Sequence, residues 1–319
     1  FNGAPMFAVA INATLVYAES PGGRRFVWVD RSGNEEFAKT GERMYAHMRL
    51  SPDGTRVAAA VSDADRALWV FGLDGSLVQK LTSGPGRHAM PLWSPDGKHI
   101  FFTKGDRAIF RVSADGSTDE ENLFGVESPR RLDPLSITPD GKRLLVKWEQ
   151  LPQFDLGVLE LGPPRAFTKI TQSGTARDGS LSPDGRWVAY QSTASTGGYE
   201  GQIIVRSFPD VQRGQWVVST GVGRSPIWSH DGRELFYRTE DGAVMAVPIA
   251  TNPTFKHDPP VRVVTPVNTL RDWASGPTYA VSPDGRRFLF IKAPELDIRT
   301  LTIVLNWDVE ANAVISKER

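Results

Sequence analysis

The chain has 319 residues, no cysteine, and equal numbers of basic and acidic residues, 37 of each, so its formal net charge is zero. The lack of cysteine excludes disulfides, thiolate nucleophiles and metal sites with cysteine ligands. The balanced charge argues against attraction of the whole chain to nucleic acid or to an anionic membrane. No apolar run reaches the roughly 18 residues of a membrane-spanning helix, so direct membrane insertion is not expected.

A four-residue turn sequence recurs along the chain. SPDG stands at 51–54, 94–97, 182–185 and 282–285, TPDG at 138–141 and SHDG at 229–232. The copies start 43 to 53 residues apart, a period typical of β-propeller blades. Proline presets the φ angle of a turn, aspartate hydrogen-bonds to the backbone ahead of it, and glycine adopts a positive φ. Each copy therefore predicts a hairpin turn between two strands, in which the aspartate has a structural role.

Each repeat places apolar strands in the same order around this turn. In the repeat that contains residues 51–54, the apolar residue Leu50 precedes the turn, and strand-like runs follow at 56–61, 67–71 and 78–82. Four short strands in a repeat of about 44 residues predict an all-β fold, a β-propeller of four-stranded antiparallel blades.

The number of blades depends on the two ends of the chain. Residues 7–17 resemble a repeat that lacks the turn sequence, and counting them as a degenerate front copy favours seven blades over six. The last repeat has expected strands at 279–282, 287–291 and 300–307 and no evident fourth strand. We therefore predict one propeller domain over residues 1–308 and a polar tail over residues 309–319.

These motifs resemble those of the TolB-like propeller family, whose blades carry the SPDG turn. More narrowly, FVWVDRSG at 26–33, SPDGRWVAY at 182–190 and WSHDGRELFY at 228–237 are similar to the C-terminal propeller regions of bacterial serine/threonine protein kinases. The resemblance implies an extracytoplasmic domain, periplasmic or on the cell surface, that is fused to or associated with a membrane-anchored kinase. The chain lacks the glycine-rich loop, HRD and DFG motifs of a kinase, so a non-catalytic sensor or scaffold is implied.

Candidate ligand-binding residues lie in the linkers between repeats, which are expected to surround one mouth of the central channel. Every linker carries arginine: Arg43, Arg87, Arg130 with Arg131, Arg177, Arg224 and Arg271. Such a ring of guanidinium groups would bind a small anionic ligand or an acidic peptide. Alternatively, the arginines pair with Asp133, Asp178 and other loop carboxylates and hold the blades together. Trp273, beside Arg271, would stack on a bound ligand.

A second hypothesis places catalysis at the same mouth. His47 and His88 precede the innermost strands of adjacent blades, and with Asp133 and Asp178 they would offer nitrogen and oxygen ligands to a divalent metal. A site of this kind would suit a lyase or lactonase acting on a sugar-derived acid. Neither an HExxH metal motif nor a GxSxG nucleophile motif accompanies these residues. We therefore expect a binding propeller without a cofactor, with a protein, peptide or small anionic partner, and keep the metal enzyme as the alternative.

Overall fold

The computed structural model describes residues 7–9, 14–18, 23–172, 174–194, 200–252, 254–270, 278–294, 301–305 and 307. The chain divides into two compact units, Arg24–Lys292 and the pair of end segments Phe1–Gly23 and Ala293–Arg319. Within the described residues, no helix combines the length and the apolar character that crossing a membrane requires.

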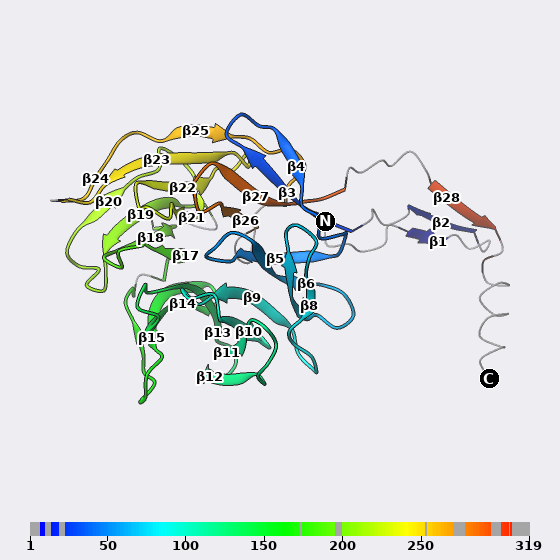
Figure 1. Cartoon of the computed structure of the whole chain (residues 1–319), viewed down its shortest axis with the longest axis horizontal. Helices are drawn as coiled ribbons and strands as arrows, with labels where there is room; N and C mark the ends of the chain where they lie inside the picture. The colour runs from blue at the N-terminus through cyan, green and yellow to red at the C-terminus, as the bar shows by residue number, and fades with distance from the viewer. Residues whose placement is uncertain are drawn as a thin grey trace. The chain divides into compact units, whose positions relative to one another are not determined.

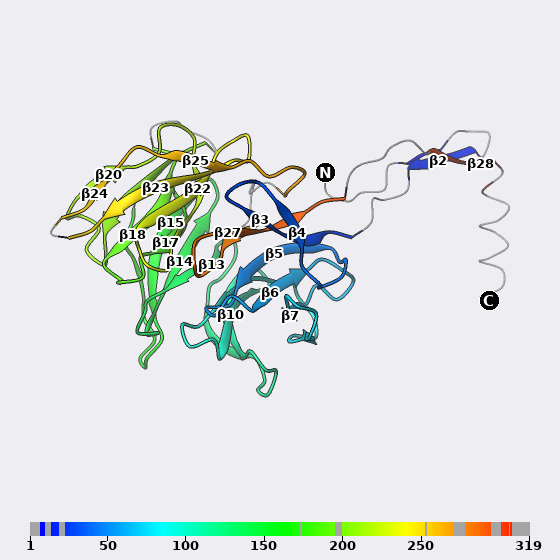
Figure 2. The same cartoon turned by 45° about the horizontal axis from the view of Figure 1, so that its top comes forward.

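The unit Arg24–Lys292 consists of six antiparallel sheets that follow one another round a ring, mostly in chain order (Figures 1 and 2). Blade 1 contains β5 (Tyr45–Leu50), β6 (Arg56–Val61), β7 (Leu68–Gly72) and β8 (Val78–Lys80). Blade 2 contains β9 (His88–Trp93), β10 (His99–Lys104), β11 (Ala108–Ser113) and β12 (Glu121–Gly125). Blade 3 contains β13 (Arg131–Ile137), β14 (Arg143–Gln150), β15 (Gln153–Glu160) and β16 (Phe167–Lys169).

The remaining three blades complete the ring. Blade 4 contains β17 (Ala176–Leu181), β18 (Trp187–Ser192), β19 (Gln202–Ser207) and β20 (Gln215–Val217). Blade 5 contains β21 (Arg224–Trp228), β22 (Glu234–Arg238), β23 (Val244–Ala250), β24 (Lys256–His257) and β25 (Val261–Val264), of which β24 and β25 both pair with β23. Blade 6 contains β26 (Tyr279–Val281), β27 (Arg287–Lys292), β3 (Arg25–Asp30) and β4 (Glu35–Phe37). The prediction of four-stranded antiparallel propeller blades is confirmed.

The middle strands of the blades are apolar on both faces because each blade is packed between two others. In β6, residues Val57 to Val61 are all buried, which matches the near-continuous apolar run in the sequence. The core between blades 6 and 1 contains a stack of aromatic rings, in which the centroids of Phe26 and Tyr45 lie 4.2 Å apart. Phe71 meets the Tyr45 ring edge-on. Aromatic contacts also join blades 2 and 3, through Phe124 and Phe167, and blades 5 and 6, through Phe236 and Phe288.

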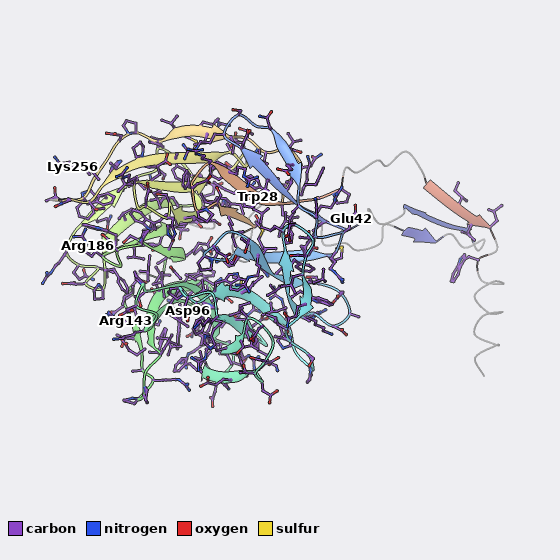
Figure 3. All side chains as sticks on the ribbon, viewed as in Figure 1. Trp28, Glu42, Asp96, Arg143, Arg186 and Lys256 are labelled. Carbon is purple, nitrogen blue, oxygen red and sulfur yellow. The ribbon has the colours of Figure 1, made fainter. Side chains whose placement is uncertain are left out.

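The aspartates of the repeated turns have the structural role predicted for them. In the turn that contains Asp96, labelled in Figure 3, the Ser94 hydroxyl donates to Asp96 Oδ1 at 2.6 Å, and the backbone N–H of Lys98 donates to the same oxygen at 3.0 Å. The Ser94 hydroxyl oxygen also accepts the N–H of His99. These hydrogen bonds lower the pKa of the Asp96 carboxyl below its ordinary value. Hydrogen bonds of the same kind lower the pKa of four counterparts, Asp53, Asp140, Asp231 and Asp284.

The turns also pack against one another in a ring. A Cβ built on Gly54 would lie 2.7 Å from Cδ of Pro283, in the turn of the neighbouring blade 6. The same relation joins four further turn glycines to the turn proline of the preceding blade: Gly97 to Pro52, Gly141 to Pro95, Gly185 to Pro139 and Gly232 to Pro183. In blade 5 the proline is replaced by His230, and there the ion pair between Arg31 and Glu234 approaches Gly285 instead.

The number of blades is six, so the prediction of seven was wrong. The third strand of the last blade is β3, which pairs with β27 from Arg25↔Lys292 to Asp30↔Arg287, and β4 is the fourth. Residues 300–307 were expected to supply the third strand, but β28 (Leu301–Leu305) pairs instead with β2 (Thr14–Ala18). The closing blade is therefore completed by residues near the start of the chain. The Arg287 guanidinium lies 4.8 Å from the ring of Trp28, labelled in Figure 3, and the Lys292 ammonium pairs with Glu35 of β4.

The second unit contains one three-stranded sheet in the order β1 (Phe7–Val9), β2, β28. Residues 7–17 were expected to be a degenerate front copy of the repeat, but the described strands within them, β1 and part of β2, pair in this sheet and not in a blade. The side chains of Ile303 and Leu305 in β28 are exposed. That residues 1–308 form a single domain stays a prediction.

The assignment of β3 to blade 6 predicts unequal effects of two truncations. Phe26→Ala removes a fully buried ring and should lower the free energy of unfolding by about 3–5 kcal/mol. Ile303→Ala, at a residue that is 61% exposed, should lower it by less than about 1 kcal/mol. Urea unfolding followed by tryptophan fluorescence measures both. A larger loss for Ile303→Ala than for Phe26→Ala would show that β28, and not β3, completes the propeller.

The contacts between turns predict that a glycine-to-alanine substitution lowers the free energy of unfolding more at a turn within this ring than at a turn outside it. Gly54 and Gly33 both have a positive φ, so alanine at either is strained by about 1–2 kcal/mol. A Cβ at Gly33 meets nothing within 4 Å, whereas at Gly54 it meets Pro283. In urea unfolding, Gly54→Ala should therefore cost about 1–3 kcal/mol more than Gly33→Ala. Equal costs would mean that the turns do not restrain one another.

The lowered pKa values of the turn aspartates predict a loss of stability in acid. A carboxyl whose pKa is lower in the folded state stabilises that state above its unfolded pKa, and this contribution is lost as the pH falls through the folded pKa. The free energy of unfolding should thus be steady near neutral pH and fall below about pH 4. The double variant Asp96→Asn/Asp140→Asn should show a shallower fall in urea titrations at several pH values. An unchanged slope would contradict this origin.

Candidate functional site

The residues singled out in the linkers gather at one end of the propeller, which we call the linker face. Each innermost strand begins at this end and finishes at its SPDG-type turn, so the opposite end is the turn face. The linker face includes Arg43, His47, Arg87, His88, Arg131, Asp133, Arg177, Asp178 and Arg224. The hairpins between second and third strands reach the same end. Arg271 and Trp273 lie outside the described residues.

Irregular pairing shapes the innermost strands at this end. The register between first and second strands shifts in blades 1 to 5, near Ala46, Met90, Leu135, Asp178 and Ser225. Met90, Asp178 and Ser225 have positive φ angles, which are uncommon for residues other than glycine. A β-bulge of this kind turns the following side chains to a new direction. Simple in-and-out alternation therefore does not predict which side chains face the channel.

A buried ionic cluster lies beside the channel in blade 3. The ammonium of Lys147 in β14 is 2.8 Å from Asp133 Oδ2 and 3.6 Å from Glu149 Oε2. Burial lowers the pKa of Lys147, but the carboxylates of Asp133 and Asp178 outweigh burial and hold it above its ordinary value. Burial raises the pKa of Asp133, and Lys147, with smaller effects of His47 and Thr103, brings it below its ordinary value. Lys147 and Asp133 are therefore both ionised at neutral pH.

The structure brings together three of the four residues proposed as metal ligands, but around a lysine. The charges of His47 and Lys147 both lower the pKa of the Asp133 carboxyl, and the charge of Asp178 raises the pKa of Lys147. Within the described part of the chain, no group of three or more His, Asp or Glu side chains has the geometry to hold a metal ion. The Lys147 ammonium supplies the positive charge that these carboxylates need. Sequence analysis missed Lys147, although a lysine within the apolar run 144–148 was a usable signal.

His88, the fourth residue of that set, lies elsewhere. Its imidazole is buried, with Nε2 3.3 Å from Glu120 Oε1 and Nδ1 3.3 Å from the carbonyl oxygen of Arg66 in blade 1. Burial lowers the His88 pKa below its ordinary value, and Glu120 opposes this only in part. Lys104 pairs with the same Glu120 carboxylate at 2.6 Å. His88 is therefore a neutral buried residue at pH 7 that links blades 1 and 2.

Polar side chains of other second strands also link the blades beneath the linker face. The Thr103 hydroxyl of blade 2 donates to the carbonyl of Leu132 in blade 3 at 2.9 Å. The buried guanidinium of Arg238 in blade 5 donates to the carbonyl of Leu270 and to the hydroxyl of Thr278, just before blade 6. Thr103, Lys147 and Arg238 occupy matching positions, opposite the bulged segment of the first strand. These polar residues were not identified from the sequence.

The channel itself is crossed by a side chain. Arg49 Nη2 of blade 1 donates to the carbonyl of Leu135 in blade 3 at 2.9 Å. Beside it is a cavity of about 20 Å³, lined by Arg49, Leu135, Asp178, Gly179, Ser225 and Pro226 together with Ile227. A cavity of this volume holds about one water molecule. This part of the channel is therefore filled by the protein's own side chains.

The linker arginines lie further out and fall into two groups. The guanidinium of Arg43 lies 4.5 Å from the ring centre of Trp69, that of Arg130 lies 5.5 Å from Trp148, and that of Arg177 lies 3.5 Å from Phe154. An aromatic ring holds a guanidinium in place without neutralising its charge.

The second group of linker arginines forms ion pairs. Arg87 pairs with Asp106 at 3.0 Å, and Arg131 pairs with Glu149 at 3.7 Å. Both carboxylates belong to the same blade as their arginine. Arg224 is half-buried at the start of β21.

A basic hollow of about 370 Å³ lies next to Arg87. Its lining includes Arg66 and Lys80 of blade 1 and the glycines of the linker, Gly84 and Gly86. Asp65 also lines it and pairs with Lys80. The hollow therefore has three cationic groups and one carboxylate. Together with the arginines on aromatic rings, it gives the linker face cationic groups suited to binding anions.

A known protein resembles part of this chain in sequence. The uncharacterized peptidase YuxL of Bacillus subtilis is 29% identical over 155 residues, which are 48% of this chain and 22% of that protein. The chain thus spans about a fifth of the length of that relative.

Two solved structures have the same architecture. The putative TolB from Agrobacterium tumefaciens is 16% identical, with a TM-score of 0.63 over 85% of this chain and 98% of that one. An oligogalacturonate lyase in complex with manganese is 13% identical, with a TM-score of 0.55 over 96% of this chain and 82% of that one. At these identities the likeness shows the fold alone.

The family is shown by the sequence match as well as by the blades. A family model described as the TolB beta propeller domain matches residues 30–199, more than half of the chain. The matched region includes four copies of the turn whose aspartate and glycine organise each blade. The chain therefore belongs to the TolB β-propeller family.

Proposed function

We propose that this propeller is a non-catalytic binding module whose linker face recognises an acidic segment of a partner protein. The observation that carries the proposal is the way the linker arginines are held. Arg43 and Arg130 lie on aromatic rings, and no described carboxylate forms an ion pair with either. Their positive charges thus remain available to an incoming anion. Arg131 is paired, yet its side chain is 52% exposed, so it also stays accessible.

The partition of charge between surface and interior supports this proposal. The carboxylates of Glu149 and Asp155 are buried and engaged by the cations of blade 3. The exposed ends of Arg87, Arg130 and Arg131 face solvent. A surface of this kind attracts acidic chains at long range and binds them with a strong dependence on salt.

The alternative, a metal-assisted lyase or lactonase, has less support. It would require His47, Asp133 and Asp178 to bind a divalent cation, and Lys147 already lies among these groups. His88 is held by Glu120 and Arg66. The likeness to the lyase structure is one of fold. The extracytoplasmic location and the link to a membrane-anchored kinase, both implied by the sequence resemblance, stay predictions.

Charge removal on the two faces tests the proposal. The triple variant Arg87→Ala/Arg130→Ala/Arg131→Ala should bind a fluorescein-labelled octaglutamate peptide about tenfold more weakly than the wild type, since each exposed pair contributes up to about 1 kcal/mol. The matched control, Arg186→Ala/Arg213→Ala/Arg233→Ala, removes the same charge from exposed arginines that also pair with aspartates near the turn face. It should leave the affinity within about twofold, because these arginines lie away from the linker face. Fluorescence anisotropy at low and high salt measures both.

Three results would contradict the proposal: no binding by the wild type, equal losses in the two triple variants, or a linker-face variant that binds as the wild type does. Thermal unfolding of each variant is the control for folding. The melting temperature should change little, because the three linker-face arginines are exposed or half-exposed.

A further inference from the structure

Among the described residues, the ladder between second and third strands is longest in blade 3, where it reaches toward the linker face. Strands β14 and β15, at the lower left in Figure 1, form eight residue pairs, from Arg143↔Glu160 to Gln150↔Gln153. In the other blades, the described second and third strands form at most six residue pairs. In every blade the first of these pairs involves the second residue after the SPDG-type turn, so the ladders start at equivalent positions. Two further pairs extend the hairpin by about 7 Å, at about 3.4 Å per residue.

The tip of this hairpin carries an exposed apolar side chain. Leu151 is 60% exposed and is flanked by the exposed amides Gln150 and Gln153. The other large apolar side chains exposed among the described residues of Arg24–Lys292 lie on outer strands or in the linker before blade 6: Phe37, Val78, Val217, Val261 and Val267. Leu151 thus differs from them in standing at the end of a projecting hairpin.

Arginines from both linkers beside blade 3 contact the same hairpin. Arg130 lies on the ring of Trp148 and donates to Gln150 Oε1 at 3.5 Å. Arg131 pairs with Glu149. From the following linker, Arg177 lies on the ring of Phe154. The hairpin is therefore surrounded by guanidinium groups close to its apolar tip.

The carboxylates of the hairpin lie beneath these cations. Glu149 is next to Lys147, and Asp155 accepts hydrogen bonds from Lys169, the Thr171 hydroxyl and the N–H of Gly174. Both are buried, whereas the Arg131 side chain is half-exposed. Near its tip, the hairpin thus exposes one leucine beside the cationic Arg130 and Arg131 of the preceding linker, whereas its two carboxylates close to the tip, Glu149 and Asp155, are buried.

We propose that the β14–β15 hairpin is the contact element for the partner, and that the partner segment carries a large apolar side chain between carboxylates. The apolar side chain would pack against Leu151, and the carboxylates would meet Arg130 and Arg131. This inference rests on the proposed function and names the chemistry of its ligand. A few side chains that become buried at the centre of an interface, most often large aromatic ones, commonly dominate its affinity.

Two peptides of equal charge test this inference. EEELFEEE carries an apolar centre, and EEESSEEE does not. The wild type should bind EEELFEEE about tenfold more tightly, the gain expected from burying one large apolar side chain. In Leu151→Ser this preference should fall below about twofold, whereas the conservative variant Leu151→Phe should keep it. The matched control Val261→Ser, at an outer-strand residue that is also 60% exposed, should keep the preference of the wild type.

The absence of cysteine allows a second measurement that does not depend on affinity. Leu151→Cys provides a single thiol for an environment-sensitive fluorophore, and Val261→Cys provides the matched control. EEELFEEE should shift the emission of the label at position 151 to shorter wavelength, because the label moves from water into an apolar contact. The label at position 261 should not respond.

The possible failures are distinguishable. If the wild type binds neither peptide, the proposed function fails and this inference fails with it. If the wild type binds both peptides equally, or if Leu151→Ser keeps the preference, the hairpin is not the contact element, while the binding of acidic segments by the linker face stands. An equal loss of preference in Val261→Ser would likewise overturn the role of Leu151.

Discussion

The structure depends on the pairing of β27 with β3, which joins the last blade to a strand near the start of the chain. A ring of blades has to close, and here the closure is made by six residue pairs of an antiparallel ladder together with the contact between the turns of blades 6 and 1. Because all six innermost strands run from the same end of the propeller toward the turn face, the described parts of the linkers lie at one face. The backbone topology alone therefore gives the propeller two different faces, the linker face and the turn face.

The two faces are stabilised in different ways. At the turn face, backbone and proline contacts repeat with little variation from blade to blade, which leaves little freedom for change. Beneath the linker face, the blades are linked by individual polar side chains, such as Thr103, Lys147 and Arg238, and each makes different bonds. Because the repeated turn contacts hold the blades together at the turn face, the side chains at the linker face can differ from blade to blade.

Much of the fold could be predicted from the sequence, because its signals are local. The turn sequence specifies a hairpin by the conformational limits of proline and glycine, and its period specifies a blade. The number of blades could not be predicted in the same way, since the partner of β27 is about 260 residues away along the chain. The apolar runs at 25–30 and 300–307 are both suitable third strands, and neither run contains a residue that decides between them.

The candidate site was predictable only at its rim. Arginine in every linker is visible in the sequence, and the structure gathers the described ones on one face. The buried groups around Lys147 could not be predicted from the sequence. Bulges in the first strands redirect side chains such as Asp178, and a buried lysine is explained only by the carboxylates around it. His88 shows the converse: its position in the chain resembles that of His47, yet its environment was set by Glu120, 32 residues further on.

The antiparallel pairing of β3 and β27 also has a mechanical consequence. Arg25, the first residue of β3, lies opposite Lys292, the last residue of β27, so the two ends of the propeller leave blade 6 at the same point. Tension applied between them would peel the two strands apart one residue pair at a time, whereas a shearing load would strain all the pairs together. The first group to feel this load is the ion pair of Lys292 with Glu35. The joint that completes the ring is thus also the place where a pulling force would open it.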